Sequence, residues 1–264
     1  MLHRIFILLL VCLQAVQVYS QDSLRYHSKF QFTPSIGSFT PLTTLLKGDA
    51  TDPLVQFTDH YRYWQLIAVS FFFHKHWGIA FNYQAGYSKS MAKKDGQFKE
   101  SIESQYGKDY YISPFTLSHD DDPIFLGEIQ QGYLGVIYRL ESNRFFIYPK
   151  LAIGISSFYT NRSQIFLKQK NANDVIEINY LPNKLPHDHF TLAPSAAMGY
   201  KISKRIYINL NVQGSFYKTN FTYTQTTTDL NSGQSTTELI PYKRKIGSLG
   251  LGAGLIIVLD RSLH

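Results

Sequence analysis

The sequence predicts an all-β protein, an eight-stranded antiparallel up-and-down transmembrane β-barrel with long extracellular loops and short periplasmic turns. Three observations support this prediction: eight segments alternate between apolar and polar residues, the connections alternate between long and short, and the polar faces are made of small and amide residues. Residues 205–217, RIYINLNVQGSFY, show the alternation most clearly. A period of two is typical of a strand with two unlike faces.

Residues 1–20 have the pattern of a secretory signal peptide. Basic His3 and Arg4 precede an apolar run, and small residues precede Gln21. The run is shorter than the roughly 20 apolar residues that a spanning helix needs. We therefore assign residues 1–20 to the signal peptide and 21–264 to the barrel domain. Acylation at Cys12 is a less favoured alternative, because two bulky residues precede this cysteine.

Cys12 is the only cysteine in the chain, so the predicted mature protein has none. Secreted eukaryotic domains more often carry disulfides. An exported chain without them has to be held by a core or by closed strand pairing. This favours a protein of the bacterial envelope.

The order of the eight predicted strands indicates how they are connected. Long connections at 41–60, 90–127, 161–188 and after residue 217 alternate with short ones at 75–76, 141–144 and 203–204. In an up-and-down meander this places every long loop at one end and every tight turn at the other, as in outer-membrane barrels. The predicted strands are 29–40, 61–74, 77–89, 128–140, 144–159, 189–202, 205–217 and 245–260.

The composition of the two strand faces predicts which one meets lipid. A sheet face exposed to water is normally rich in Lys and Glu, whereas the polar faces here are rich in Gly, Ala, Ser, Asn, Gln and Tyr. Such residues suit the narrow interior of an eight-stranded barrel. The aliphatic faces are therefore expected to point outward. Pro34, Pro149 and Pro194 fall inside strands, where each removes a ladder hydrogen bond, and we expect them to mark bulges or rim positions.

Charged and polar residues on the inward phase form a candidate lumen cluster. Its cations suggest either an anion path or a basic plug, or else a structural network in which Asp260 pairs with Arg205 and tyrosines fill the remaining space. The network is favoured, because an eight-stranded interior is normally packed. The predicted cluster comprises Arg139, Tyr148, Lys150, Lys201, Arg205, Tyr207, Asn209, Asn211, Gln213 and Asp260.

Motifs for metal binding and catalysis are weak. The acidic stretch SHDDDP at 118–123 lacks the spacing of a calcium loop, and HKH at 74–76 and HDH at 187–189 lack further ligands at fixed offsets. No G-x-S-x-G motif is present. The sequence therefore predicts no cofactor, no metal site and no catalytic residue.

Residues 217–242 are expected to project above the membrane. Tyr, Phe and Thr continue the alternation, and LNSG at 230–233 provides a turn. The expected structure is an extended hairpin whose edge could pair with another chain. The alternative is a long polar loop.

These features together resemble a known family. The signal peptide with Gln21 at the mature start, the eight amphipathic strands and the Gly-rich final segment GSLGLGAGLIIVLD are similar to the small outer-membrane β-barrels of Gram-negative bacteria, among them the OmpA-like and OmpX-like barrels. The resemblance implies an outer-membrane location and a role in envelope integrity, adhesion or assembly. The chain departs from the family in ending RSLH, without a terminal aromatic residue, and no peptidoglycan-binding domain follows.

The expected function is therefore that of a non-enzymatic barrel, a monomer or part of an envelope complex, whose loops contact lipopolysaccharide or a surface protein. The net charge of +7 and the loop lysines suit the phosphates of an anionic outer leaflet. Scattered lysines without a recognition motif make nucleic acid a poor partner. Alternatives are a lipid-modifying barrel enzyme, an accessory subunit of a secretion or uptake machine, and a soluble barrel carrying a small apolar ligand. The loop lysines are Lys89, Lys93, Lys94, Lys99, Lys168 and Lys170.

Overall fold

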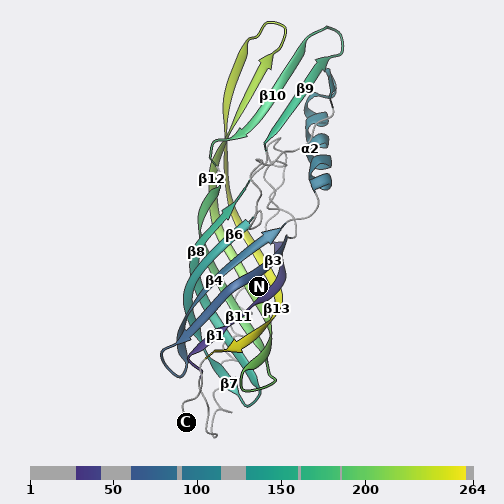
Figure 1. Ribbon diagram of the computed structural model, residues 1–264. Coiled ribbons are helices and arrows are strands. Elements are labelled where there is room, and N and C mark those ends of the chain that lie inside the picture. Colours follow the sequence, from purple (N-terminus) through teal and green to yellow (C-terminus); the bar gives the residue numbers. More distant parts are fainter. Residues whose placement is uncertain are drawn as a thin grey trace.

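The computed structural model describes residues 28–42, 61–87, 91–113, 129–159, 162–184 and 186–259. All described strands belong to one antiparallel sheet, and one helix accompanies them (Figure 1). No helix in these ranges is long and apolar enough to cross a membrane. The elements are β1 (Phe30–Phe32), β2 (Ser35–Pro41), β3 (Tyr61–Phe72), β4 (Trp77–Tyr87), α2 (Met91–Tyr106), β5 (Tyr110–Ile112), β6 (Ile129–Tyr138), β7 (Leu140–Ser142), β8 (Phe145–Phe158), β9 (Ser163–Gln169), β10 (Val175–Pro182), β11 (His187–Lys201), β12 (Ile206–Asp229) and β13 (Ser235–Val258).

The lower part of the molecule is a closed ring of strands. The order around the ring is β2-β3-β4-β6-β8-β11-β12-β13, and β13 pairs back onto β2. β1 shares the position of β2, since both pair with β3 and β13, and β7 continues β6 along β8. The ring therefore has eight strand positions, which confirms the predicted fold class. Closure leaves no unpaired strand edge to face hydrocarbon.

Short turns join the strands at one end of the ring. They lie at 73–76, 143–144 and 202–205, each overlapping a turn predicted at 75–76, 141–144 or 203–204. Asn143 has a φ of 46°, a left-handed conformation that Asn tolerates better than most residues. The helix and the longest hairpins project from the opposite end (Figure 1). The predicted separation of short and long connections is confirmed.

Each of the three prolines lies at an interruption of a strand ladder. Pro34 separates β1 from β2, and its carbonyl still accepts the N–H of Leu255 at 3.1 Å. Pro149 lies in β8 where the neighbouring β6 breaks into β7. Pro194 lies in β11 where the ladder to β12 lapses between Leu192 and Ser195. Proline has no N–H to donate, so it lies at such breaks or where its nitrogen faces the unpaired side of a strand.

The aliphatic side chains of the ring point away from the lumen. In β12, Leu210 is 62% exposed whereas its neighbour Asn209 is 4% exposed, and β13 shows the same alternation. The predicted orientation of residues 205–217 is confirmed, and the exposed aliphatic residues form a continuous apolar belt around the barrel. Aromatic residues gather at its short-turn end, where Trp77 lies edge-on to Tyr138 and Phe145 to Tyr200. Members of the belt include Ile36, Trp64, Phe81, Leu134, Leu151, Ile153, Leu210, Leu251 and Leu255.

A second folded unit, the extracellular extension, projects above the belt (Figure 1). It consists of α2, β5, β9, β10 and residues 218–245 of β12 and β13. The β12–β13 ladder continues without a break to Thr228 and Ser235, so the predicted hairpin is confirmed. The carboxylate of Asp229 accepts hydrogen bonds from the hydroxyl of Ser232 and from the backbone N–H groups of Asn231 and Ser232. These hydrogen bonds, that of the hydroxyl most of all, lower the pKa of Asp229.

The segment 161–188 was predicted only as a long connection, yet it contributes two strands to the extension. β10 pairs with the upper half of β12, β9 pairs with β10, and β5 pairs with β9. One face of this sheet buries Ile165, Leu167, Ile178 and Tyr180, and Ile102 of α2 belongs to the same hydrophobic cluster. The cluster gives the extension a hydrophobic core outside the membrane.

Candidate functional site

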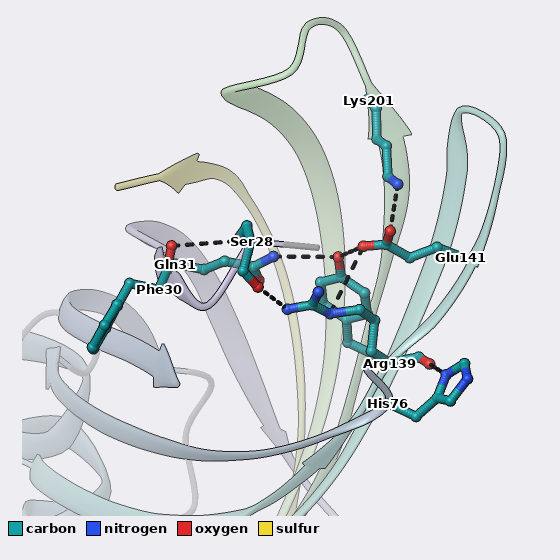
Figure 2. Close-up of polar contacts among 8 residues, drawn as sticks. Ser28, Phe30, Gln31, His76, Arg139, Glu141 and Lys201 are labelled. Atoms are coloured by element: carbon teal, nitrogen blue, oxygen red, sulfur yellow. Dashed lines mark hydrogen bonds and ion pairs between the residues drawn. The ribbon is translucent and has the colours of Figure 1, made fainter. Parts of the chain in front are cut away.

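The periplasmic end of the lumen is closed by a hydrogen-bonded network around Glu141 (Figure 2). Glu141 Oε2 lies 2.6 Å from Nζ of Lys201, and Glu141 Oε1 accepts the hydroxyl of Tyr148 and lies 4.0 Å from Nε of Arg139. Gln31 Nε2 donates to the Tyr148 hydroxyl at 3.4 Å. The network joins β1, β7, β8 and β11 across the mouth of the barrel.

Arg139 is held in place from several directions at the break between β6 and β7. It is 2% exposed, its Nη2 donates to the carbonyl of Ser28 at 2.5 Å, and its guanidinium lies 3.5 Å above the ring of Phe72. Nδ1 of His76 lies 3.0 Å from the Arg139 carbonyl. These contacts make Arg139 a plug residue rather than a mobile charge in an open path.

The predicted lumen cluster lies mostly inside the barrel, but not as one group. Tyr148 and Tyr207 are buried among the apolar side chains at the periplasmic end, and Asn209 and Gln213 are buried in the lumen above them. Lys150 and Asn211 line a cavity, and Lys201 lies at the rim with Glu141.

Two members of the cluster stand apart. Arg205 was predicted to point inward, but this is wrong, because it lies exposed in the turn 202–205, outside the ladder whose alternation defined the inward phase. Asp260, its predicted partner, lies outside the described residues.

Glu141 is the centre of the network, although the sequence pattern did not predict a role for it. It falls in the stretch ESNR, whose pattern predicts a turn of four residues. The turn is shorter, and residues 140–142 form β7. Had the strand been extended by two residues, the alternation would have placed Glu141 on the same side as Arg139.

The middle of the lumen is filled by amide and hydroxyl groups. Gln131 accepts a hydrogen bond from Nε2 of Gln84 and donates to the hydroxyls of Ser156 at 3.0 Å and Ser215 at 3.3 Å. The hydroxyl of Thr191 donates to Ser156 at 2.8 Å. These hydrogen bonds link β4, β6, β8, β11 and β12. They make the interior of the barrel rigid, and the side chains that form them occupy its space.

Below this layer a cavity of about 40 Å³ remains. Its lining mixes amides and hydroxyls with a single cation, Lys150, and a few apolar side chains. The volume suffices for about three water molecules. Hydrogen-bonded side chains thus flank the cavity on both sides along the lumen.

Aromatic residues close the extracellular end of the lumen and continue into the extension. One hydrophobic cluster includes Phe39, Tyr61 and Tyr63 at the top of the ring as well as Phe221 and Tyr223 in the extension. Rings in contact run through it, for example Phe39 on Tyr61 with centroids 4.9 Å apart. Ring and extension thus share one core.

Two histidines lie in this aromatic cluster, above the last belt residue of β11. His187 is 4% exposed and stacks on Phe221 with centroids 4.0 Å apart, and His189 stacks on Tyr217 at 5.8 Å. Burial, reinforced by the neighbouring His189, lowers the pKa of His187 to about 4, which outweighs the opposite effect of Asp188. The HDH motif is therefore an aromatic packing element.

The other sequence motifs for metal binding gain no support. The acidic stretch 118–123 lies outside the described residues. His74 and His76 have ring centroids 6.4 Å apart in a periplasmic turn. Within the described ranges no three His, Cys, Asp or Glu side chains come together in a way that could hold a metal ion.

Comparisons with known proteins add little detail. No protein-family profile and no curated protein matches the chain. Among solved structures, outer membrane protein AlkL in lipid bilayers is similar over 93% of this chain and 97% of its own, with 13% identity and a TM-score of 0.37. The P. putida toluene transporter TodX is similar over 88% of this chain and 91% of its own, with 9% identity and a TM-score of 0.21. The CymD monoaromatic hydrocarbon channel is similar over 89% of this chain and 90% of its own, with 7% identity and a TM-score of 0.17.

The structural class of this protein is therefore inferred from its own geometry. A closed ring of eight strand positions carries an apolar belt outside, an aromatic rim at the short-turn end and hydrogen-bonded polar groups inside. These are the properties of barrels that span the outer membrane of Gram-negative bacteria. The chain is an integral outer-membrane β-barrel.

Proposed function

We propose that this barrel acts at the cell surface through its extracellular extension, in adhesion or envelope integrity, without enzymatic activity. The observation that carries the proposal is the contrast between the two parts of the molecule. The lumen is filled by packed and hydrogen-bonded side chains, whereas the extension is folded, held by a hydrophobic core that it shares with the top of the ring, and raised above the membrane. The barrel is then an anchor, and the extension is the functional surface.

The outer face of the extension supplies a flat surface for a partner. Cross-strand pairing aligns Leu181, Thr224 and Leu239 in one row on this face, and two further threonines of β12 follow in the next rows. Leu239 is 62% exposed. Exposed apolar residues set among hydroxyls are typical of a protein-binding surface.

The free strand edge of β13 is less suitable than this face. Residues 235–246 have no neighbour on their second side among the described residues, but Pro241 removes one N–H and Lys243 and Lys245 add charge. Prolines and lysines are the usual means of keeping an edge from pairing. We therefore place the partner on the face, and edge pairing stays a prediction.

A variant without the upper hairpin tests this proposal. Thr219 and Arg244 are directly opposite each other in the ladder, so an Asn-Gly turn can join them in place of residues 220–243. The shortened barrel should still migrate faster on gels before heating. When each protein is placed in nanodiscs, the attachment of these nanodiscs to whole cells, measured by flow cytometry, should be at least tenfold lower for the shortened barrel. Equal attachment of both proteins would contradict the proposal.

Contact with lipopolysaccharide is supported by a basic patch just above the belt, formed by Lys218, Lys243 and Lys245. Lys218 and Lys245 are directly opposite each other on β12 and β13, and all three are exposed. Like charges at such positions repel each other unless an anion lies between them. No ion pair to these lysines occurs among the described residues. Phosphate groups of the outer leaflet would fill this role.

Replacing the three lysines of the patch by Gln should lower the affinity for purified lipopolysaccharide about tenfold and reduce its dependence on salt. The matched control replaces Lys75, Lys204 and Arg205 by Gln, which removes the same charge at the periplasmic end. If both triple variants lose affinity equally, the binding depends on net charge and the patch has no special role.

Passage of small apolar molecules is a second candidate function, and the names of TodX and CymD state such an activity for those proteins. The specific observation in its favour is the aromatic cluster that continues from the extension into the top of the ring. Uptake of radiolabelled toluene by cells that make the barrel would distinguish the two. Uptake above that of empty cells, abolished by Phe221→Asp, would favour this candidate.

A further inference from the structure

The two walls of the lumen cavity differ in how their polar groups are satisfied. On the wall formed by β3 and β4, Gln65 Nε2 donates to the carbonyl of Thr33 at 3.0 Å and Asn82 Nδ2 donates to Gln65 Oε1 at 3.2 Å. No side-chain atom of Gln65 or Asn82 is buried without a hydrogen-bond partner.

The opposite wall, formed by β8, β11 and β12, carries an ammonium group and two amide N–H groups without an acceptor. Lys150, Ser195 and Gln213 are direct cross-strand neighbours in one row, and Asn211 follows in the adjacent row of β12. Neighbours of this kind have Cβ atoms roughly 5 Å apart, so their polar ends can meet at one point. Nε2 of Gln213 and Nδ2 of Asn211 have no hydrogen-bond partner among the described residues, and Gln213 is 5% exposed.

The charges around the cavity are also unbalanced. No carboxylate belongs to the lining, in which Lys150 is the cation. The nearby carboxylate of Glu141 is engaged by Lys201, Tyr148 and Arg139. A cation enclosed in a barrel without a counter-ion is costly, and so are buried amide N–H groups without an acceptor.

We propose that the cavity binds a small monovalent inorganic anion of the chloride class, with Lys150 as its charge partner and the amide groups of Asn211 and Gln213 as donors. A halide accepts hydrogen bonds from all these groups at once. A water molecule accepts only two, donates two of its own and leaves the ammonium charge uncompensated. The volume of about 40 Å³ is large enough for a small inorganic ion together with one or two water molecules.

The ion would complete the hydrogen bonding of the lumen rather than pass through it. The contacts of Arg139 lie on one side of the cavity and the amide layer around Gln131 lies on the other. The inference is independent of the proposed role of the extension, because it concerns only the interior of the ring.

Crystals of the purified barrel grown with sodium bromide as the only halide test the proposal directly. An anomalous bromide peak should appear between Lys150, Asn211 and Gln213, and it should be absent in Lys150→Met, whose side chain has similar length and no charge. Water density alone in the wild-type cavity, or bromide only on the outer surface, would overturn the proposal.

Thermal unfolding provides a second test that needs no crystals. At constant ionic strength, replacing gluconate by chloride should raise the Tm of the wild type by a few degrees, because a bound ion stabilises only the folded state. Lys204→Met, which changes an exposed turn lysine, should keep this rise, and Lys150→Met should lose it. An equal rise in all three proteins would count against the site. If Lys150→Met does not fold, the bromide experiment on the wild type still decides.

Discussion

Glu141 Oε2 lies 2.6 Å from Nζ of Lys201, so that a carboxylate of β7 and an ammonium group at the end of β11 close the periplasmic mouth of the barrel together. The two strands are separated in the sheet by β8. The pair is therefore an ion pair that spans β8, and Arg139 and Tyr148 extend this network toward the lumen.

Removal of this carboxylate should destabilise the barrel. Glu141→Gln leaves Lys201 and Arg139 without a counter-charge in a partly buried setting, and we expect a loss of about 2–3 kcal/mol in the free energy of unfolding. Urea unfolding in lipid vesicles, followed by the fluorescence of Trp64 and Trp77, measures it. Glu238→Gln, which removes an exposed carboxylate of the extension, serves as the control and should change stability by less than about 0.5 kcal/mol.

Two glycines on neighbouring strands should respond in opposite ways to Ala. A Cβ at Gly154 would lie 1.8 Å from the carbonyl oxygen of Gly132, whereas a Cβ at Gly132 would meet nothing within 4 Å. Gly154→Ala should therefore cost about 1–3 kcal/mol through backbone displacement. Gly132→Ala should be neutral or slightly stabilising. Refolding yield, read from the heat-dependent shift on gels, distinguishes the two, and equal yields would show that the strands approach less closely than described.

The lipid-facing belt predicts a depth-dependent cost for a charge. Leu210 lies near the middle of residues 206–217, the part of β12 within the ring, and Ile206 lies at its periplasmic end. Leu210→Arg should cost about 2–4 kcal/mol and Ile206→Arg about 0–1 kcal/mol, since the guanidinium of the latter reaches the interface. Reversible unfolding from vesicles measures both values. A soluble protein would show no such gradient along one strand.

Acid should loosen the contact between ring and extension. The pKa of His187 is lowered to about 4 in the folded protein, so this histidine stays neutral there while the unfolded chain takes up a proton below about pH 6.5. Its contribution is complete above pH 6.5 and is lost as the pH falls toward 4, by about 2–3 kcal/mol. Urea unfolding between pH 7 and pH 4 measures this. His187→Phe keeps the stacking on Phe221 and should remove this part of the pH dependence.

The backbone conformation at Asn143 determines which residue types this turn can accept. With φ at 46°, Asn143→Gly should leave folding unchanged, whereas Asn143→Val should cost about 1–2 kcal/mol because its branched Cβ meets the following carbonyl. Refolding rates and yields of the two variants in detergent provide the measurement. A tolerated valine would indicate that the turn adopts another conformation.

The barrel itself could be predicted from the sequence because its determinants are local. Alternation with a period of two fixes which residues share a face, and the lengths of the connections fix which strand ends lie together. Residues 205–217 show this well, since their outward leucine and inward amides lie as their alternation requires. The interruptions at Pro34, Pro149 and Pro194 also follow from local chemistry, because a residue without an N–H cannot donate to a ladder.

Contacts between distant segments could not be predicted in this way. Glu141 meets Lys201 only because β7 and β11 pair with the two sides of β8, and Arg205 leaves the lumen because the ladder ends one residue beyond it. The extension depends on pairing of β10 with β12, which are separated by β11 in the sequence, and on a core shared with α2. The donor-rich wall of the cavity likewise requires three strands to align Lys150, Ser195 and Gln213. The sequence by itself determined the faces and ends of the strands, and the tertiary structure decided which polar groups meet inside the ring, because that depends on register between strands rather than on periodicity within one.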